Sequence, residues 1–378
     1  MFKRNNRQYL ALIVLIVFIF SLLTIYAASA QTKEMKLSAR SAVLYQSDTK
    51  SFLYKKNADT RMPMASTTKI MTALVVLDEV DDLEKTIEID PRAVGTEGSS
   101  AYLKAGDIVS IRELLYALLL QSANDAAVAL ACHISGDVES FSALMNARAN
   151  SLGLKNTSFK NPHGLDDKEH YTTAEDLAII AAEALKNEQF TEICSTYKKT
   201  IITGERTRTY TNHNKLLKSY DGAIGVKTGY TDESGRCLVG AAERDGLRFI
   251  TVTLDAPSDW ADHKALFDYG FASLERLSLA SAYEYSYDLP AINKNGKTIR
   301  VTNTEELSKI VPRGDYEIKK YVVLPRYITG KVDIGEILGY VSFTVNGEEA
   351  GSVPLVATEA VSATKQSVIE RIKNFIFG

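Results

Sequence analysis

The stretch that decides the fold of this 378-residue chain reads Met62-Pro63-Met64-Ala65-Ser66-Thr67-Thr68-Lys69. It opens a run with helical apolar spacing, at Ile70, Met71, Leu74, Val75 and Leu77, which predicts a helix over residues 66–80. Residues i and i+3 share one helix face, so we expect Lys69 beside the Ser66 hydroxyl. The helix N-terminus would favour negative charge on Ser66, and a partly buried lysine can lose its proton near neutral pH.

This Ser-x-x-Lys pair does not by itself indicate catalysis. The pattern occurs four times, starting at Ser47, Ser66, Ser195 and Ser362, and only Ser66 opens a long apolar-periodic helix. Taken alone, it is better explained by a serine that caps a helix and a solvated lysine.

A second polar motif is Ser122-Ala123-Asn124, the only Ser-x-Asn in the sequence. It falls between two expected helical segments, 114–120 and 126–132. Such a pair can relay a proton and hold a substrate carbonyl. The alternative is that Ser122 or Asn124 only caps the second helix.

A third motif, Lys227-Thr228-Gly229, is the only Lys-Thr-Gly and lies in an expected strand just before a hairpin. Lysine and threonine side chains can bind a carboxylate, and glycine lets the backbone approach a ligand closely. Alternatively, Gly229 marks a bulge in an ordinary strand. The order Ser-x-x-Lys, Ser-x-Asn, Lys-Thr-Gly is the signature of penicillin-recognising serine enzymes.

At these residues the chain resembles the exported D-alanyl-D-alanine carboxypeptidases, the low-molecular-mass penicillin-binding proteins. The likeness covers roughly residues 35–275. Further runs that carry it are Gly98-Ser99-Ser100, Leu120-Gln121-Ser122-Ala123-Asn124-Asp125-Ala126, Asn161-Pro162-His163-Gly164-Leu165 and Gly225-Val226-Lys227-Thr228-Gly229-Tyr230-Thr231.

The resemblance implies a reaction and a role for each catalytic residue. Ser66 would attack the penultimate D-alanine carbonyl of a peptidoglycan stem peptide, expel the terminal D-alanine and form an acyl-enzyme that water then hydrolyses. Lys69 would take the hydroxyl proton. Ser122 and Asn124 would assist proton transfer and position the substrate. β-Lactams would acylate the same serine, and no cofactor or metal is implied.

It also implies the substrate-binding groups. Lys227 and Thr228 would bind the terminal carboxylate, and Gly229 would let the strand approach the substrate. The backbone N–H groups of Ser66 and Tyr230 would form the oxyanion hole, aimed at where negative charge develops.

Two positions depart from the family pattern. Some relatives have histidine where Tyr230 stands, which is expected to change the rate or pH profile rather than the reaction. Many relatives carry an arginine after the last strand of this domain that helps hold the substrate carboxylate. The segment 258–263 contains none, which puts the affinity for the substrate carboxylate in question.

The apolar patterns predict an α+β fold of the penicillin-binding-protein and β-lactamase type. Alternation predicts a hairpin over residues 41–56 and strands over residues 223–230, 236–243 and 247–255, which would share one antiparallel sheet. Helices are expected at about residues 110–120, 124–135, 138–152, 173–187 and 260–275. Short alternating runs after Leu277, with turns at Asn295-Gly296 and Asn346-Gly347, predict a small all-β domain.

The two ends of the chain predict where it is sent. Residues 1–30 read as a signal peptide: a cationic start, an uncharged run from Leu10 to Tyr26, and small residues at Ala28 and Ala30. An uncleaved anchor is the alternative. The expected organisation is then a peptidase domain over residues 31–276, the β domain over 277–362, and an amphipathic helix over 363–378. That helix either docks on its own domain or lies on a membrane surface, and the resemblance favours the membrane at the extracytoplasmic face.

Composition narrows the function further. A formal charge of −3, or −6 once the cations of residues 1–30 are removed, argues against nucleic-acid binding. Three widely spaced cysteines, Cys132, Cys194 and Cys237, suggest buried free thiols. The competing functions are a serine β-lactamase, for which the Glu-x-x-Leu-Asn motif is missing, and a non-catalytic cell-wall binding protein, which would usually have lost a reactive residue. Endopeptidase side activity, β-lactam turnover, a growth or sporulation role and oligomeric state stay open.

Overall fold

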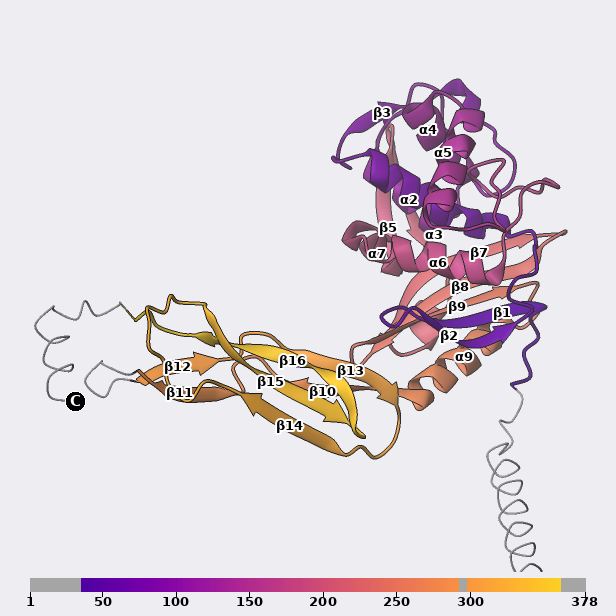
Figure 1. Ribbon diagram of the computed structural model, residues 1–378. Helices are drawn as coiled ribbons and strands as arrows, with labels where there is room; N and C mark the ends of the chain where they lie inside the picture. Colours follow the sequence, from indigo (N-terminus) through magenta and orange to yellow (C-terminus); the bar gives the residue numbers. More distant parts are fainter. Residues whose placement is uncertain (1–34, 292–297, 362–378) are drawn as a thin grey trace, which may run out of the picture. The chain divides into compact units, whose positions relative to one another are not determined.

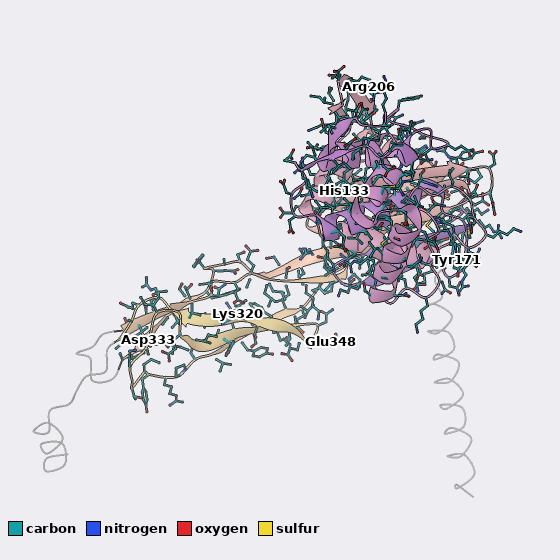
Figure 2. All side chains as sticks on the ribbon, turned by 90° about the horizontal axis from the view of Figure 1, so that it is seen from above. His133, Tyr171, Arg206, Lys320, Asp333 and Glu348 are labelled. Carbon is teal, nitrogen blue, oxygen red and sulfur yellow. The ribbon has the colours of Figure 1, made fainter. Side chains whose placement is uncertain are left out.

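The computed structural model describes residues 35–291 and 298–361. An α+β domain precedes a β-rich domain, which confirms the predicted fold class (Figure 1). Figure 2 marks the first domain with His133, Tyr171 and Arg206, and the second with Lys320, Asp333 and Glu348. The predicted signal peptide, the turn at Asn295-Gly296 and the amphipathic helix over 363–378 lie outside the described residues.

One antiparallel sheet organises the first domain. Its strand order is β2-β1-β9-β8-β7, so the first hairpin and the last strands share a sheet as predicted. The strands are β1 (Ser41–Gln46), β2 (Ser51–Lys56), β7 (Ala223–Thr231), β8 (Gly235–Arg244) and β9 (Leu247–Leu254). The sheet ends at β7, the strand that carries the Lys-Thr-Gly motif.

Helices cover both faces of this sheet, as Figure 1 shows. On one face lie η1 (Ala65–Thr68), α2 (Lys69–Glu79), α3 (Ile111–Leu120), α4 (Asn124–Ser135), α5 (Val138–Ser151) and α6 (Ala174–Ala184). On the other lies α9 (Asp259–Ser273), which contacts β1, β8 and β9. Strand β1 is buried along its whole length because α6 and α9 both pack against it.

Several elements were not predicted from the sequence. A hairpin of β5 (Lys198–Thr203) and β6 (Arg206–Thr211) follows α7 (Glu188–Ser195), and the short elements β3 (Thr86–Glu88), η2 (Pro91–Ala93), β4 (Ile108–Ser110) and α8 (Leu216–Ser219) complete the domain. The helix predicted over 66–80 begins as a 3₁₀ turn, η1, before α2 starts at Lys69. The helix predicted to reach residue 275 ends at Ser273, because strand pairing takes over at Leu274.

The second domain is all β, as predicted. Its main sheet has the order β11-β12-β16-β15-β14, and β10 pairs with β13. The strands are β10 (Leu274–Ala280), β11 (Ser286–Pro290), β12 (Thr298–Thr302), β13 (Leu307–Pro312), β14 (Ile318–Val323), β15 (Ile337–Val345) and β16 (Glu348–Ala357). The predicted turn at Asn346-Gly347 joins β15 to β16 with φ of 51° and 85°, which suits asparagine and glycine.

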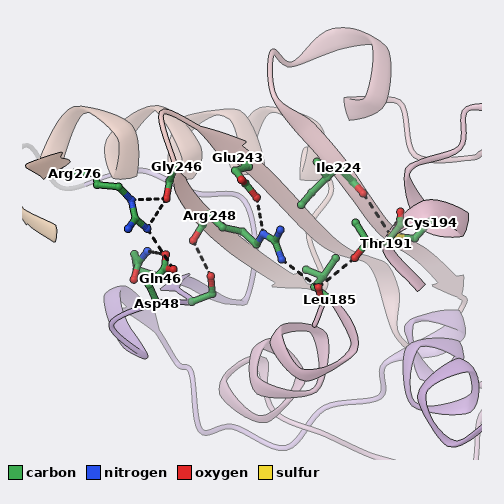
Figure 3. A network of polar contacts seen from close by, with 11 residues as sticks. Gln46, Asp48, Leu185, Thr191, Cys194, Ile224, Glu243, Gly246, Arg248 and Arg276 are labelled. Atoms are coloured by element: carbon green, nitrogen blue, oxygen red, sulfur yellow. Dashed lines mark hydrogen bonds and ion pairs between the residues drawn. The ribbon is translucent and has the colours of Figure 1, made fainter. Parts of the chain in front are cut away.

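The three cysteines are buried and free, as predicted. Cys194 lies at the end of α7, where its thiol contacts the Ile224 carbonyl oxygen at 3.4 Å, and burial raises its pKa to about 12 (Figure 3). Nearby, Arg248 of β9 pairs with Glu243 at 2.7 Å and donates to the Leu185 carbonyl at 3.1 Å. These contacts tie the sheet to the ends of α6 and α7.

Candidate active site

Ser66 lies in the 3₁₀ turn that leads into α2, and it is half-buried. The residue before it, Ala65, is buried with φ of 47°, a left-handed conformation that costs a non-glycine residue of the order of 1–3 kcal/mol. Two hydroxyls stabilise the turn: Thr67 Oγ1 donates to the Met64 carbonyl at 2.6 Å, and Thr68 Oγ1 donates to that of Ala65 at 2.8 Å. The serine is thus presented on a rigid, locally strained turn.

A buried histidine, His170, stabilises this turn through a hydrogen bond to Thr68. His170 Nδ1 accepts a hydrogen bond from the Lys160 backbone N–H at 3.0 Å. The ring proton therefore resides on Nε2, which donates to Thr68 Oγ1 at 2.7 Å. Burial lowers the pKa of His170 to about 4, so this neutral tautomer persists at neutral pH. His170 is thus a positioning residue for η1.

Lys69, the first residue of α2, is fully buried, and its Nζ contacts three oxygens. It lies 2.9 Å from Ser66 Oγ, 2.7 Å from Asn124 Oδ1 and 2.5 Å from the His163 carbonyl oxygen. The amide and carbonyl oxygens can only accept, so they take both N–H groups of a neutral amine. The remaining lone pair then faces the serine hydroxyl, which can donate to it.

Ser122 and Asn124 are held at the start of α4. Ser122 is buried with φ of 62°, a second strained residue in the site. Asn124 donates from Nδ2 to the Glu97 carbonyl at 2.5 Å, and its backbone N–H donates to the Ser99 carbonyl at 2.7 Å. These bonds fix the amide so that Oδ1 points at Lys69. The capping alternative is wrong, because the N-cap of α4 is Ala123 and no side-chain hydrogen bond caps this helix.

Lys227 lies on β7 and is almost fully buried. Its Nζ donates to Ser122 Oγ at 3.0 Å and to the Thr228 carbonyl at 2.8 Å. The two lysines are therefore linked to neighbouring groups of the Ser-x-Asn segment, Lys69 to Asn124 and Lys227 to Ser122. The three motifs come together in one place, although their catalytic roles stay predictions.

Gly229 explains how β7 can lie so close to the nucleophile. A Cβ atom at this position would lie 3.0 Å from both Ala65 Cβ and the Ser66 backbone nitrogen. The bulge considered in the sequence analysis is not present at Gly229, since the β7–β8 register shifts only between Ala223 and Gly225. Beyond it, Tyr230 is 63% exposed, and its hydroxyl donates to Asp232 at 3.0 Å.

Ser66, Ser122, Thr228, Gly229 and Tyr230 line a cavity of about 1080 Å³. Residues of the β5–β6 region, including Tyr197, Asn212 and His213, form another part of its wall. Lys69, Asn124 and Lys227 are buried, and hydrogen bonds connect them to the lining serines: Lys69 to Ser66 and Lys227 to Ser122, with Asn124 bonded to Lys69. In the part of the chain that the structure describes, no cluster of three or more His, Cys, Asp or Glu side chains is placed to hold a metal ion.

Burial sets the electrostatics of the site. It lowers the pKa of Lys69 well below its usual range, and the positive charge of Lys227 lowers it further. Burial also lowers the pKa of Lys227 to about 7. Burying an unpaired ammonium is costly, so a neutral amine beside Ser66 is the favoured state. The arrangement can therefore deprotonate a serine and stabilise negative charge near it.

Sequence reasoning missed several supporting residues. One is the His163 carbonyl, which lies in the Asn-Pro-His-Gly-Leu run. Another is the buried His170, which follows that run. The run contributed to the family resemblance, but no role was assigned to its residues. Asp125, next to Asn124, accepts bonds from the Ala101 and Leu103 backbone N–H groups at 2.9 and 3.0 Å, which fixes the loop behind Ser99. Backbone carbonyls, and side chains that only hold the candidate catalytic residues in place, leave no distinctive pattern in a single sequence.

Comparison with known families gives one consistent result. Residues 27–258 match the family model described as D-alanyl-D-alanine carboxypeptidase. Residues 279–363 match the model described as penicillin-binding protein 5, C-terminal domain. Both matches agree with the order of domains inferred from the sequence, while the exact boundaries at 276 and 362 stay predictions.

Individual relatives cover between 64% and 89% of this chain. The chain is 34% identical to the D-alanyl-D-alanine carboxypeptidase DacF of Bacillus subtilis, over 87% of each chain. It is 31% identical to DacC of Escherichia coli, over 89% of this chain and 88% of that one. Among solved structures, DacD of Francisella tularensis has a TM-score of 0.62 with 30% identity, over 88% and 96% of the two chains. The Streptomyces K15 DD-transpeptidase has a TM-score of 0.61 with 39% identity, over 64% and 100%.

The close approach of β7 to η1 gives a first test. In Gly229→Ala the new methyl group would collide with Ala65 and the Ser66 backbone, so β7 must move away from the nucleophile. We expect the second-order rate of acylation by a fluorescent penicillin to fall at least about tenfold, as misplaced catalytic groups do. Thermal unfolding serves as the control for folding. An acylation rate equal to that of the wild type would show that this approach is not required.

The charge of Lys227 gives a second test. The positive charge of Lys227 lowers the pKa of Lys69, so the Lys227→Gln substitution, which removes that charge, must raise the pKa of Lys69. The neutral fraction of Lys69 grows as pH rises through its pKa, so the acidic limb of the acylation profile should move to higher pH. The measurement is the second-order rate of penicillin acylation between pH 4 and pH 10, at sub-saturating penicillin, where the pH profile reports the free enzyme. A lower rate with an unmoved acidic limb would contradict the coupling.

Proposed function

Because the chain belongs to the D-alanyl-D-alanine carboxypeptidase family, we propose that Ser66 is the nucleophile with which it removes the terminal D-alanine of peptidoglycan stem peptides. The enzyme is a serine D,D-carboxypeptidase that β-lactams acylate. The geometry around Lys69 is the main support for assigning this reaction to Ser66.

In the first step, the lone pair of Lys69 takes the proton of Ser66 Oγ across 2.9 Å. The resulting alkoxide attacks the carbonyl carbon of the penultimate D-alanine. The backbone N–H groups of Ser66 and Tyr230 stabilise the oxyanion that forms. This step needs Lys69 neutral, which its burial and the nearby Lys227 both favour.

In the second step, the C–N bond breaks and the departing amine needs a proton. Ser122 donates it, and Lys227 replaces the proton across their 3.0 Å hydrogen bond. Thr228 binds the terminal carboxylate until D-alanine leaves. Lys69 then releases the proton taken from Ser66 to solvent, and Lys227 takes one up, which restores both lysines. Water enters and gives a proton to the neutral Lys69 as it attacks the ester carbonyl. The bond to Ser66 Oγ breaks, and Lys69 returns the proton to that oxygen, which yields the shortened peptide and free Ser66.

One observation carries this assignment: Lys69 Nζ lies 2.7 Å from Asn124 Oδ1 and 2.5 Å from the His163 carbonyl oxygen, two atoms that can only accept. A neutral amine would donate both of its N–H groups to them. The amine therefore has one orientation, with its lone pair toward Ser66. A non-catalytic cell-wall binding protein would have no need for a lysine held neutral and oriented toward a serine in this way.

The central test is Ser66→Ala. Loss of the only proposed nucleophile should abolish both D-alanine release from diacetyl-Lys-D-Ala-D-Ala and covalent labelling by penicillin. Mass spectrometry of the protein reports the adduct, and mass spectrometry of the peptide reports the product. Ser195→Ala, which alters another Ser-x-x-Lys serine, is the matched control and should label normally. Undiminished labelling of Ser66→Ala would refute the assignment.

A serine β-lactamase is the nearest competing function. It shares the nucleophile, so labelling alone does not separate the two enzymes. A time course does: the carboxypeptidase stays acylated by penicillin and releases D-alanine, whereas a lactamase clears penicillin rapidly and leaves the stem peptide intact.

We also propose that the protein is exported and held at the extracytoplasmic membrane surface by its C-terminal segment. The support is sequence pattern: the signal-peptide features of residues 1–30, and apolar residues at helical spacing from Val368 to Ile376 with charges between them. In residues 35–291 and 298–361, no helix is long and apolar enough to cross a membrane.

Truncation tests the membrane contact. Deleting the residues after Thr364 removes the apolar stripe and should move the protein from the membrane fraction to the soluble fraction. Penicillin labelling of the truncated protein should persist, because the catalytic residues lie far away in the sequence. If the truncated protein stays with the membrane, the segment is not the anchor.

A further inference from the structure

An arginine that the sequence analysis did not single out lines the proposed active-site cavity. Arg236 lies near the start of β8, and its side chain is 43% exposed. The segment 258–263, where an arginine was expected from the resemblance, instead supplies Asp259 and Trp260 to the same cavity. Arg236 and Asp259 form an ion pair at 2.9 Å.

Strand register places Arg236 beside the proposed carboxylate-binding residue. Arg236 pairs with Tyr230 across β7 and β8, and Thr228 pairs with Leu238. Since side chains alternate along a strand, Thr228, Tyr230 and Arg236 project from one face of the sheet. Arg236 is therefore the diagonal neighbour of Thr228, at a spacing of about 7–8 Å that long side chains can bridge.

Two neighbours hold the guanidinium in place. Asp259 is only 2% exposed, and both of its carboxylate oxygens accept from Nη2 of Arg236, at 3.0 and 2.9 Å. The guanidinium carbon lies 5.8 Å from the ring centroid of Trp260, within cation–π range. Because both of these bonds come from Nη2, the two N–H groups of Nη1 are the part of the guanidinium that can donate to another carboxylate.

The cavity has two other cationic side chains in its wall, Lys215 and Lys218. Both come from the segment around α8, and Lys218 lies 3.8 Å from the ring centroid of Tyr197, over the face of that ring. Neither belongs to the strand paired with β7. A planar guanidinium also matches carboxylate geometry better than an ammonium does.

We propose that Arg236, positioned by Asp259, binds the α-carboxylate of the terminal D-alanine together with Thr228. It would therefore set the preference of this enzyme for substrates with a free carboxyl terminus. The inference rests on the proposed function of Ser66, since it assumes that the scissile bond lies at that serine. Arg236 contacts substrate in this arrangement, and Asp259 acts only through Arg236.

The test compares two peptides that differ at the carboxyl terminus: diacetyl-Lys-D-Ala-D-Ala and the same peptide ending in D-alaninamide. For Arg236→Gln, we expect kcat/KM on the free acid to fall about tenfold to a hundredfold, the effect of losing a hydrogen bond to a charged group. The loss should fall mainly on KM, and kcat/KM on the amide should hardly change. Arg236→Lys should recover part of the preference.

Removing Arg236 alone leaves a buried carboxylate without its partner, which can destabilise the fold. The double variant Arg236→Gln with Asp259→Asn removes both charges and should show the same loss of preference. Arg300→Gln is the matched control, because Arg300 pairs with Asp288 in the β domain at 3.0 Å; its preference should equal that of the wild type.

The outcomes separate this inference from the proposed function. A wild-type enzyme that releases no D-alanine would refute the proposed function itself. If the wild type is active but folded Arg236→Gln keeps its preference for the free acid, Arg236 is not the carboxylate ligand. A preference lost in Lys218→Gln and kept in Arg236→Gln would overturn the inference and identify Lys218 as the carboxylate ligand.

Discussion

The site depends on one constraint: the amino group of Lys69 is buried among neutral acceptors. A buried ammonium is costly unless a carboxylate compensates it, and the oxygens that Lys69 contacts belong to an amide, a backbone carbonyl and a hydroxyl. The nearby Lys227 adds repulsion. Asp125 attracts the ammonium more weakly, and its carboxylate is occupied by the loop over residues 100–103. The fold therefore produces a base by withholding a counter-ion.

Three separate parts of the chain must come together to form this environment, and a different structural feature positions each of them. The turn before α2 presents Ser66 through a left-handed Ala65, braced by His170. The start of α4 holds Asn124 through the backbone of the loop at residues 97–99. The edge strand β7 comes close because Gly229 has no side chain. Strain and close packing are concentrated where the chemistry needs fixed distances.

Much of this could be predicted from the sequence, because the signals are local. Apolar period gave the sheet strands and the main helices, and rare tripeptides gave the residues that meet around Ser66. The β5–β6 hairpin escaped because its strands are mostly exposed and polar, so alternation is weak. The His163 carbonyl escaped because a backbone acceptor has no residue type. Arg236 escaped because its place follows from the register of β7 against β8, which a single sequence does not state.

The two kinds of cation in the site divide the work according to how easily each loses its proton. Lys227 has a pKa of about 7, so near neutral pH it can both donate to Ser122 and exist without charge. Such a group suits proton transfer, but it is a poor permanent anchor for a carboxylate. An arginine keeps its charge across the whole physiological range. Because Arg236 lines the cavity and stays charged, the cavity offers a fixed positive charge while the buried lysines gain and lose protons. The ion pair with Asp259 holds this charge in place and does not involve Lys69.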